Sequence, residues 1–256
     1  MSAEQYAVLG SPISHSKSPL IHNACFKVLP KNAIYTAHDV NNLGEFLSKH
    51  DQLLGVSITM PLKEQAFQLA IRHDGASQRT QSCNTLMRTE TGWSGYNTDV
   101  FGLRQAAGLH TTSTVAILGT GASARSALVA FENSETAIWG RNEAKSLELA
   151  AEFGATSATF EDALQAEFVV STLPGTTLRE LLPTLSTFPG TILDISYVKE
   201  QSPHVQFAGG QVSGLEMLIW QALMQQRIFA GRKPSEAFEN ESKMLEVIMS
   251  ALNMTK

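Results

Sequence analysis

The feature that most constrains this chain is a glycine-rich turn between a predicted strand and a predicted helix. The strand Thr114–Leu118 runs directly into Gly119-Thr-Gly121-Ala-Ser-Ala124. In a G-x-G-x-x-A turn the first glycine allows the sharp bend and the second lets a pyrophosphate approach the backbone. The small third residue lets helix and strand pack closely, and the phosphates lie at the helix N-terminus. The turn therefore predicts a dinucleotide-binding unit; the alternative is an ordinary glycine-rich turn.

The end of the next predicted strand indicates which dinucleotide is bound. Units that bind NAD usually place an acidic residue there, on the ribose 2′-hydroxyl, but this strand ends in Trp139-Gly140-Arg141-Asn142. A carboxylate would repel a 2′-phosphate, whereas a guanidinium offers it charge-assisted hydrogen bonds. We therefore predict NADP, with Arg141 as the main ligand of the 2′-phosphate and Lys145 as a second cation. The alternative is that Arg141 is a solvated surface charge.

The order of predicted elements indicates an α/β fold in two domains. The first 100 residues alternate strands and helices and then form a hairpin, which favours a mostly parallel sheet. Strands are predicted at Tyr6–Leu9, Ala33–Val40, Gly55–Met60, Cys83–Arg88 and Trp93–Tyr96, and helices from Ser18, over Asn41–Lys49 and over Leu62–Ile71. Residues 101–213 repeat the alternation as a Rossmann-type unit, and two amphipathic helices follow, roughly Leu215–Ala230 and Ser235–Leu252.

Composition and charge exclude several classes of protein. The net charge of -5 and the scattered basic residues argue against a nucleic-acid partner. No segment approaches the roughly 20 apolar residues that a membrane span needs, and the first residues do not form a signal peptide. The two cysteines and the spacing of the seven histidines complete no disulfide framework and no zinc set. We expect a cytoplasmic protein without a bound metal.

Polar residues follow the strands of the first domain, where open α/β sheets bind ligands. Ser16 and Ser18 precede a helix N-terminus and suit a carboxylate, although Ser18 could simply cap the helix. Lys63 opens the helix after the third strand, where a cation opposes the helix macrodipole. Asp99 is either a first-turn acid of the next helix or a partner of Lys63.

Together these segments resemble the shikimate dehydrogenase family over nearly the whole chain. The matching segments are Gly10-Ser-Pro-Ile-Ser-His-Ser-Lys-Ser-Pro19, Ser57-Ile-Thr-Met-Pro-Leu-Lys63-Glu64, Cys83-Asn-Thr-Leu86, Asn97-Thr-Asp99, Gly119–Arg125 and Ser213-Gly-Leu-Glu-Met-Leu218 with Gln221. The chain departs from the commoner pattern in three segments. Gly140-Arg141-Asn142 replaces Asn-Arg-Thr, with Lys145 in place of the later Arg; Val170-Ser171-Thr172 replaces Asn-Ala-Thr; and Ser57-Ile58-Thr59 replaces Asn-Val-Thr. None of these departures removes a catalytic group.

The resemblance implies a role for each matching residue. Lys63 and Asp99 would be the catalytic pair. The substrate would be held by Ser16 and Ser18 at its carboxylate, by Thr59, Asn84 and Gln221 at its ring hydroxyls, and by the nearby Tyr197. The cofactor would be held by Gly119, Thr120, Gly121, Ala122, Ser123, Arg141, Asn142 and Lys145, with Ile195 and Gly214 beside the nicotinamide. Residues 214–256 would complete the substrate domain of residues 1–100, leaving the active site in the cleft beside the NADP-binding domain, residues 101–213.

The implied activity is the reversible, NADPH-dependent reduction of 3-dehydroshikimate to shikimate, by a monomer or a homodimer. Lys63 would donate the proton that the developing alkoxide needs. One alternative is a quinate/shikimate dehydrogenase of broader specificity. Another is a non-catalytic NADP-binding sensor, although a sensor has no need of Lys63 together with Asp99. A third is a methylene-tetrahydrofolate dehydrogenase, which has no obvious use for the serine pair.

Overall fold

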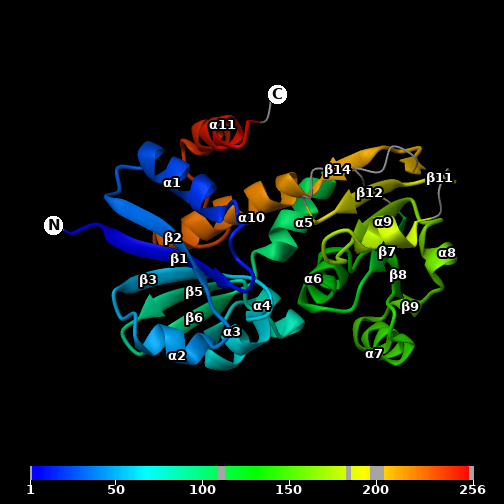
Figure 1. Cartoon of the computed structure of the whole chain (residues 1–256), viewed down its shortest axis with the longest axis horizontal. Helices are drawn as coiled ribbons and strands as arrows, with labels where there is room; N and C mark the ends of the chain where they lie inside the picture. Colours follow the sequence, from blue (N-terminus) through cyan, green and yellow to red (C-terminus); the bar gives the residue numbers. More distant parts are fainter. Residues whose placement is uncertain (1, 109–112, 183–185, 197–204, 254–256) are drawn as a thin grey trace. The chain divides into compact units, whose positions relative to one another are not determined.

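The computed structural model describes residues 2–108, 113–182, 186–196 and 205–253. The chain forms two compact units, one of Met1–Thr98 with Ile219–Lys256 and one of Asp99–Leu218. It therefore leaves the first unit after Thr98 and returns to it within helix α10 (Gly214–Phe229), as the colours of Figure 1 trace. Among the described residues, no helix is long and apolar enough to cross a membrane.

The first unit is built on a six-stranded mixed sheet with the order β2-β1-β3-β5-β6-β4. Its strands are β1 (Glu4–Gly10), β2 (Ala33–Asp39), β3 (Leu53–Ile58), β4 (Arg72–His73), β5 (Thr85–Thr89) and β6 (Gly92–Tyr96). Its helices are α1 (Ser18–Val28), α2 (Leu43–Ser48), α3 (Lys63–Leu69), α4 (Gly75–Thr80) and α11 (Glu241–Ala251), with most of α10. Strands β1, β2 and β3 are parallel, whereas β5 is antiparallel to β3 and β6, which confirms the predicted hairpin.

Both faces of this sheet are buried, because β1 alternates apolar side chains onto each. Ala7 and Leu9 belong to a core cluster that includes residues of α2 and α3, while Tyr6 and Val8 belong to a cluster with Phe229 of α10. Helix α1 begins at Ser18, as predicted, with Pro19 in its first turn. Ile21 and Cys25 lie on its buried side, whereas Leu20 faces solvent.

The second unit is a six-stranded parallel sheet with the order β14-β12-β10-β7-β8-β9. Read from β9, this is the strand order of a Rossmann fold, which confirms the predicted fold class. The strands are β7 (Thr114–Leu118), β8 (Glu135–Trp139), β9 (Thr156–Ser157), β10 (Phe168–Ser171), β12 (Thr191–Asp194) and β14 (Gln211–Ser213). The helices are α5 (Asp99–Ala107), α6 (Ala122–Ala130), α7 (Glu143–Phe153), α8 (Phe160–Ala163) and α9 (Thr177–Leu181), and β11 (Ser186–Phe188) pairs with β13 (Val205–Phe207).

The last helix, α11, is shorter than the predicted range Ser235–Leu252. Residues 235–240 are turns and irregular backbone, and α11 begins only at Glu241. Arg227 of α10 explains this difference, because its guanidinium donates to the carbonyl oxygen of Pro234 at 2.8 Å and to both carboxylate oxygens of Glu241 at 2.9 Å. This bidentate pair, in which Arg227 is buried, holds the connection in a turn and fixes where the helix starts.

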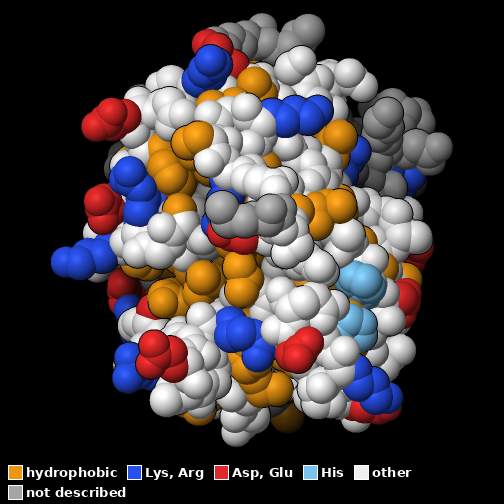
Figure 2. All heavy atoms as spheres, turned by 90° about the vertical axis from the view of Figure 1, so that its left-hand side faces the viewer, with side chains coloured by type: hydrophobic (Ala, Val, Ile, Leu, Met, Phe, Trp, Pro, Cys, Tyr) orange, Lys and Arg blue, Asp and Glu red, His pale blue; other side chains and the backbone are white. Residues whose placement is uncertain are grey.

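Figure 2 shows one face of the molecule, on which Lys and Arg side chains are interspersed with Asp and Glu rather than gathered into a basic patch. This distribution agrees with the acidic net charge of the whole chain. It offers no electrostatic footprint for a nucleic acid on that face.

Candidate active site

The carboxyl ends of β1 and β3 lie side by side because of the chain's route through the first sheet. From β1 the chain passes to β2 on one side and then returns to β3 on the other. Such a crossover is where open α/β sheets bind their ligands. Two hydrogen bonds join the loops there, from Ser11 N–H to the Met60 carbonyl at 3.0 Å and from Thr59 N–H to the Leu9 carbonyl at 2.9 Å.

Gly10 makes this close approach of the two loops possible. A Cβ atom on Gly10 would overlap the methyl group of Thr59 and would lie 2.8 Å from the carbonyl oxygen of Met60. Thr59 is half-buried at the end of β3. The glycine of the opening motif therefore places Thr59 against the loop that leads to Ser16.

The two predicted carboxylate ligands lie at the N-terminus of α1. Ser18 is the first residue of the helix and is 7% exposed, and its backbone N–H donates to Oγ of Ser16 at 3.3 Å. Lys17 is the N-cap residue, and its side chain makes no capping hydrogen bond. The cap at Ser18 that the sequence allowed is therefore not formed, and two hydroxyls adjoin a positive helix end.

Lys63 is the first residue of α3, as predicted, and is half-buried. Its carbonyl oxygen accepts the backbone N–H of Cys83 at 3.0 Å, which joins the start of α3 to the segment that carries Asn84. The lysine follows β3 by a short loop, so it starts from the same sheet edge as Thr59.

Asn84 is held by several hydrogen bonds around its side-chain amide. Its Oδ1 accepts from the backbone N–H of Thr98 at 2.8 Å and from Oγ1 of Thr85 at 2.9 Å. Its Nδ2 donates to Oγ1 of Thr98 at 2.8 Å and to Oε1 of Gln221 at 3.3 Å. The fold thus brings together Asn84 and Gln221, which are 137 positions apart and were both predicted to bind ring hydroxyls.

Asp99 directly follows Thr98 and is the first residue of α5. Its side chain is 5% exposed. As a first-turn acid it interacts favourably with the helix macrodipole, which is the structural role that the sequence allowed. Because α5 belongs to the second unit, the catalytic pairing of Asp99 with Lys63 stays a prediction.

The glycine-rich turn of the second unit has the geometry of a phosphate cradle. Gly119 has a φ of +118°, which favours glycine, and a Cβ atom there would overlap Oγ1 of Thr172. Gly121 is the N-cap of α6, is exposed, and has open space where a Cβ would lie. The turn therefore leaves the first N–H groups of α6 uncovered by any N-cap side chain, which suits an anion.

The two predicted ligands of the 2′-phosphate follow strand β8 and lie around the start of α7. Arg141 and Lys145 are both exposed, and Asn142 is the N-cap, with Oδ1 accepting the backbone N–H of Lys145 at 3.1 Å. A Cβ atom on Gly140 would lie 2.5 Å from Cγ2 of Thr120. The glycine at position 140, where the family more often has asparagine, therefore leaves room for Thr120 of the glycine-rich turn.

Ile195 and Gly214 lie next to each other at the carboxyl edge of the second sheet. A Cβ atom on Gly214 would be 2.9 Å from the carbonyl oxygen of Ile195. The backbone N–H of Ile195 donates to the carbonyl oxygen of Ser171 at 3.0 Å. Burial raises the pKa of the neighbouring Asp194, although hydrogen bonds from Ser196 act in the opposite direction. Tyr197 lies outside the described residues.

Sequence reasoning missed a second buried glutamine, Gln225, one turn beyond Gln221 on α10. The spacing of two glutamines on the same face of an apolar helix was the signal that could have found it. Among the described residues, no three His, Cys, Asp or Glu side chains are grouped so that they could hold a metal ion.

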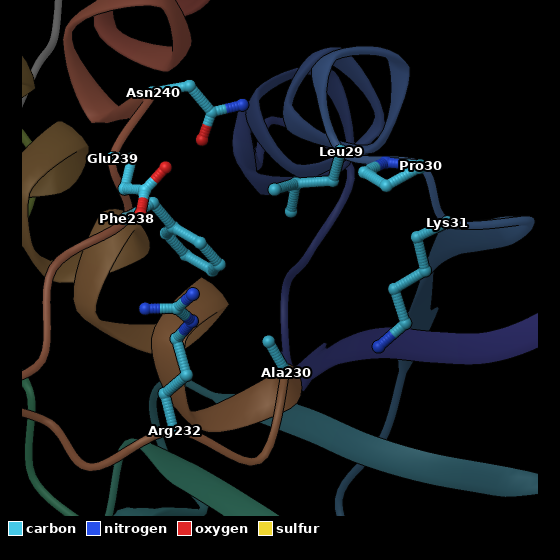
Figure 3. Close-up of a pocket in the computed structure, with 8 residues that line it drawn as sticks. All are labelled: Leu29, Pro30, Lys31, Ala230, Arg232, Phe238, Glu239 and Asn240. Atoms are coloured by element: carbon cyan, nitrogen blue, oxygen red, sulfur yellow. The ribbon is translucent and has the colours of Figure 1, made fainter.

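The first unit also carries an open pocket with a volume of about 660 Å³, and Figure 3 shows the residues around it. It is lined by Leu29, Pro30, Lys31, Ala230, Arg232, Phe238, Glu239 and Asn240. None of the predicted site residues lines it. Its two cations are paired, Lys31 with Glu4 at 2.9 Å and Arg232 with Glu236 at 3.6 Å, so it contributes nothing to the predicted site.

Two family models match the chain, one in each unit. The model of the shikimate dehydrogenase substrate binding domain matches residues 8–86. A model described as NADP oxidoreductase coenzyme F420-dependent matches residues 114–197.

Curated relatives match over nearly the full length. Shikimate dehydrogenase (NADP+) of Hyphomonas neptunium is 33% identical over 262 residues, which cover 93% of this chain and 97% of the relative. The enzyme of the same name from Leptospira interrogans is 31% identical over 288 residues, which cover 96% of this chain and 97% of the relative.

Solved structures share the fold. A shikimate 5-dehydrogenase from Thermus thermophilus, in complex with NADP(H) and shikimate, has a TM-score of 0.81 and 27% identity, covering 98% of this chain and 100% of the other. Shikimate dehydrogenase of Mycobacterium tuberculosis has a TM-score of 0.79 and 28% identity, covering 96% of this chain and 99% of the other.

Proposed function

Because this chain belongs to the shikimate dehydrogenase family, we propose that it catalyses the reversible, NADPH-dependent reduction of 3-dehydroshikimate to shikimate. The observation that carries the proposal is the gathering of matching polar residues in the first unit. Ser16, Thr59 and Lys63 follow the two strands of the crossover, and Asn84 joins Gln221 at the neighbouring strand. These groups suit a small hydroxylated carboxylic acid.

The substrate carboxylate is proposed to bind Ser16 and Ser18. Their two hydroxyls offer donors at the positive end of the α1 helix dipole. The ring hydroxyls then face Thr59, Asn84 and Gln221, which present one hydroxyl and two amides. Tyr197 is proposed to complete this set from the second unit.

Proton transfer is assigned to Lys63 and Asp99. NADPH, when bound, supplies the hydride that reduces the C3 carbonyl group. Lys63 donates a proton from Nζ to the oxygen that becomes the hydroxyl, and it stabilises negative charge on that oxygen until the proton has moved. The Asp99 carboxylate orients the ammonium group and accepts a hydrogen bond from the new hydroxyl. The reverse reaction uses the same two groups, with Lys63 as the proton acceptor.

The residues of the second unit fit a dinucleotide. The exposed Gly121 leaves the start of α6 open to the pyrophosphate, and Arg141 with Lys145 would hold the 2′-phosphate. Ile195 and Gly214 would adjoin the nicotinamide. We assign substrate binding to residues 1–100 with 214–256 and NADP binding to residues 101–213, in a cytoplasmic monomer or homodimer.

One spectrophotometric assay tests this function. The purified chain is mixed with shikimate or quinate and with NADP or NAD, and reduction of the cofactor is followed. We expect turnover with shikimate and NADP. The rate should be much lower when quinate replaces shikimate or when NAD replaces NADP. Comparable rates with quinate would replace the proposal with a broader quinate/shikimate dehydrogenase. Binding of NADPH without any turnover of shikimate would support a sensor and contradict the proposal.

A further inference from the structure

Gln225 lies one helical turn beyond Gln221 on α10, and its side chain is 1% exposed. Its Oε1 accepts a hydrogen bond from Oγ of Ser57 at 2.8 Å and from Nε2 of His22 at 3.1 Å. Its Nε2 donates to Oγ1 of Thr85 at 2.9 Å, and also to a backbone carbonyl, that of residue 84, at 3.3 Å. All four hydrogen-bonding positions of this buried amide are therefore occupied.

The surrounding donors determine which way the Gln225 amide points. The hydroxyl of Tyr35 donates to Oγ of Ser57 at 2.5 Å, so the proton of Ser57 is directed onto Oε1 of Gln225. His22 is fully buried, and burial lowers its pKa to about 3, so its ring is neutral at physiological pH and carries one proton. Because Oε1 of Gln225 can only accept, that proton is assigned to Nε2, and Nδ1 accepts from Nε2 of Gln226. Two donors on Oε1 leave Nε2 directed at Thr85.

This orientation passes to Asn84 through the Thr85 hydroxyl. Because Oγ1 of Thr85 receives the N–H of Gln225, its own proton is directed onto Oδ1 of Asn84, 2.9 Å away. The backbone N–H of Thr98 donates to the same oxygen. With Oδ1 held by these donors, Nδ2 of Asn84 is turned toward Gln221.

We propose that Gln225 is a positioning residue for substrate recognition. It does not act on the reacting atoms; through Thr85, and together with the backbone N–H of Thr98, it holds the Asn84 amide in the orientation that it presents to the ring hydroxyls of the substrate. The inference rests on the proposed function, in which Asn84 binds a ring hydroxyl. Discrimination between substrates that carry or lack that hydroxyl therefore depends on a side chain outside the binding set.

Two variants test this relay. Gln225→Met removes the amide while keeping an unbranched side chain of similar length. Thr85→Val keeps Gln225 and the local shape but removes the hydroxyl that connects it to Asn84. Gln226→Met is the matched control, because Gln226 is equally buried at 1% and bonds Nδ1 of His22 at 2.8 Å, on the opposite side of the ring from Gln225.

The measurement is kcat/KM for shikimate and for its 4-deoxy and 5-deoxy analogues, with calorimetric titration of shikimate as a readout that does not require turnover. We expect the preference for shikimate over at least one analogue to fall about five- to tenfold in Gln225→Met and in Thr85→Val, since each loses one directed hydrogen bond. Shikimate binding should weaken by a similar factor, while KM for NADP stays unchanged. Gln226→Met should keep the wild-type preference even where its stability is lower.

The outcomes separate this inference from the proposed function. If the wild-type chain oxidises shikimate and both test variants keep the wild-type preference, the positioning role of Gln225 is refuted and the function stands. If Gln226→Met loses the preference as strongly as Gln225→Met, the effect is general loosening of the core, and the relay is refuted as well. If the wild-type chain leaves shikimate unchanged, the proposed function fails, and this inference fails with it.

Discussion

The backbone N–H of Thr98 donates to Oδ1 of Asn84 at 2.8 Å, while Nδ2 of Asn84 donates to Oγ1 of Thr98 at the same distance. This closed pair anchors the point at which the chain leaves the first unit. Asp99 is the next residue along the chain, so a proposed substrate ligand and the proposed catalytic carboxylate are only one peptide bond and one hydrogen-bonded pair apart. Substrate binding and proton transfer are therefore expected to depend on the same short segment.

Replacing Gly10 with alanine should destabilise the first unit. The added Cβ atom would overlap Thr59 and approach the carbonyl oxygen of Met60, so the two loops at the sheet crossover must separate. We expect the free energy of unfolding, measured by urea titration, to fall by about 1–3 kcal/mol. KM for shikimate should rise, since Thr59 moves with its loop. Gly75→Ala is the control, because no atom lies within 4 Å of the new Cβ, and an unchanged stability in both variants would refute the account.

Replacing Arg141 with alanine should weaken NADPH binding selectively. The exposed guanidinium is proposed to form charge-assisted hydrogen bonds with the 2′-phosphate, which NADH lacks. Loss of such bonds should raise KM for NADPH about 10- to 100-fold and leave the kinetics with NADH nearly unchanged. Arg72→Ala, at an exposed position of the first unit, should alter neither constant. An unchanged KM for NADPH in Arg141→Ala would show that this residue is a solvated surface charge.

The free energy of unfolding should decrease as the pH is lowered, because of His22. Burial lowers the pKa of its ring from the ordinary 6.5 to about 3, so below pH 6.5 the unfolded chain binds a proton that the folded chain does not. The folded state keeps its full stability above pH 6.5 and loses it progressively as the pH falls toward 3. The slope approaches about 1.4 kcal/mol per pH unit.

The variant His22→Gln isolates this contribution. Between pH 7 and pH 5, the wild-type free energy of unfolding should decrease by about 2 kcal/mol more than that of His22→Gln. The control His15→Gln, at an exposed position, should retain the wild-type pH dependence. Equal decreases in wild type and His22→Gln would mean that the folded state accommodates a protonated ring.

The parts of the fold that could be predicted are those with local signals. Strand β7, its glycine-rich turn and α6 occur together in one short segment, and the residues needed for that turn are adjacent in sequence. Helix α4, with the sequence GASQRT, was missed because it carries no large apolar side chain that could mark a buried face, and α8 was missed because four residues are too short to display a helical period. The start of α11 was misplaced because Arg227, on another helix, holds the preceding turn.

The site shows the same division between local and distant causes. Ser16, Thr59 and Lys63 follow strand ends in recognisable motifs, so the sequence placed them at one edge of the sheet. The role of Gln225 depends on Ser57, which is 168 positions away, and no local pattern carries that pairing. Contacts of this kind arise only when α10 returns to the first unit.

The most direct test of the central claim is the turnover number for shikimate oxidation in Lys63→Ala, Asp99→Asn and the double variant. Each single change should lower kcat by about 10²–10⁴-fold. The double variant should be only slightly less active than the less active of the two single variants, because both residues serve the same proton transfer. Retention of most of the wild-type turnover in Lys63→Ala, or losses that multiply in the double variant, would contradict the assignment of the two residues as one catalytic pair.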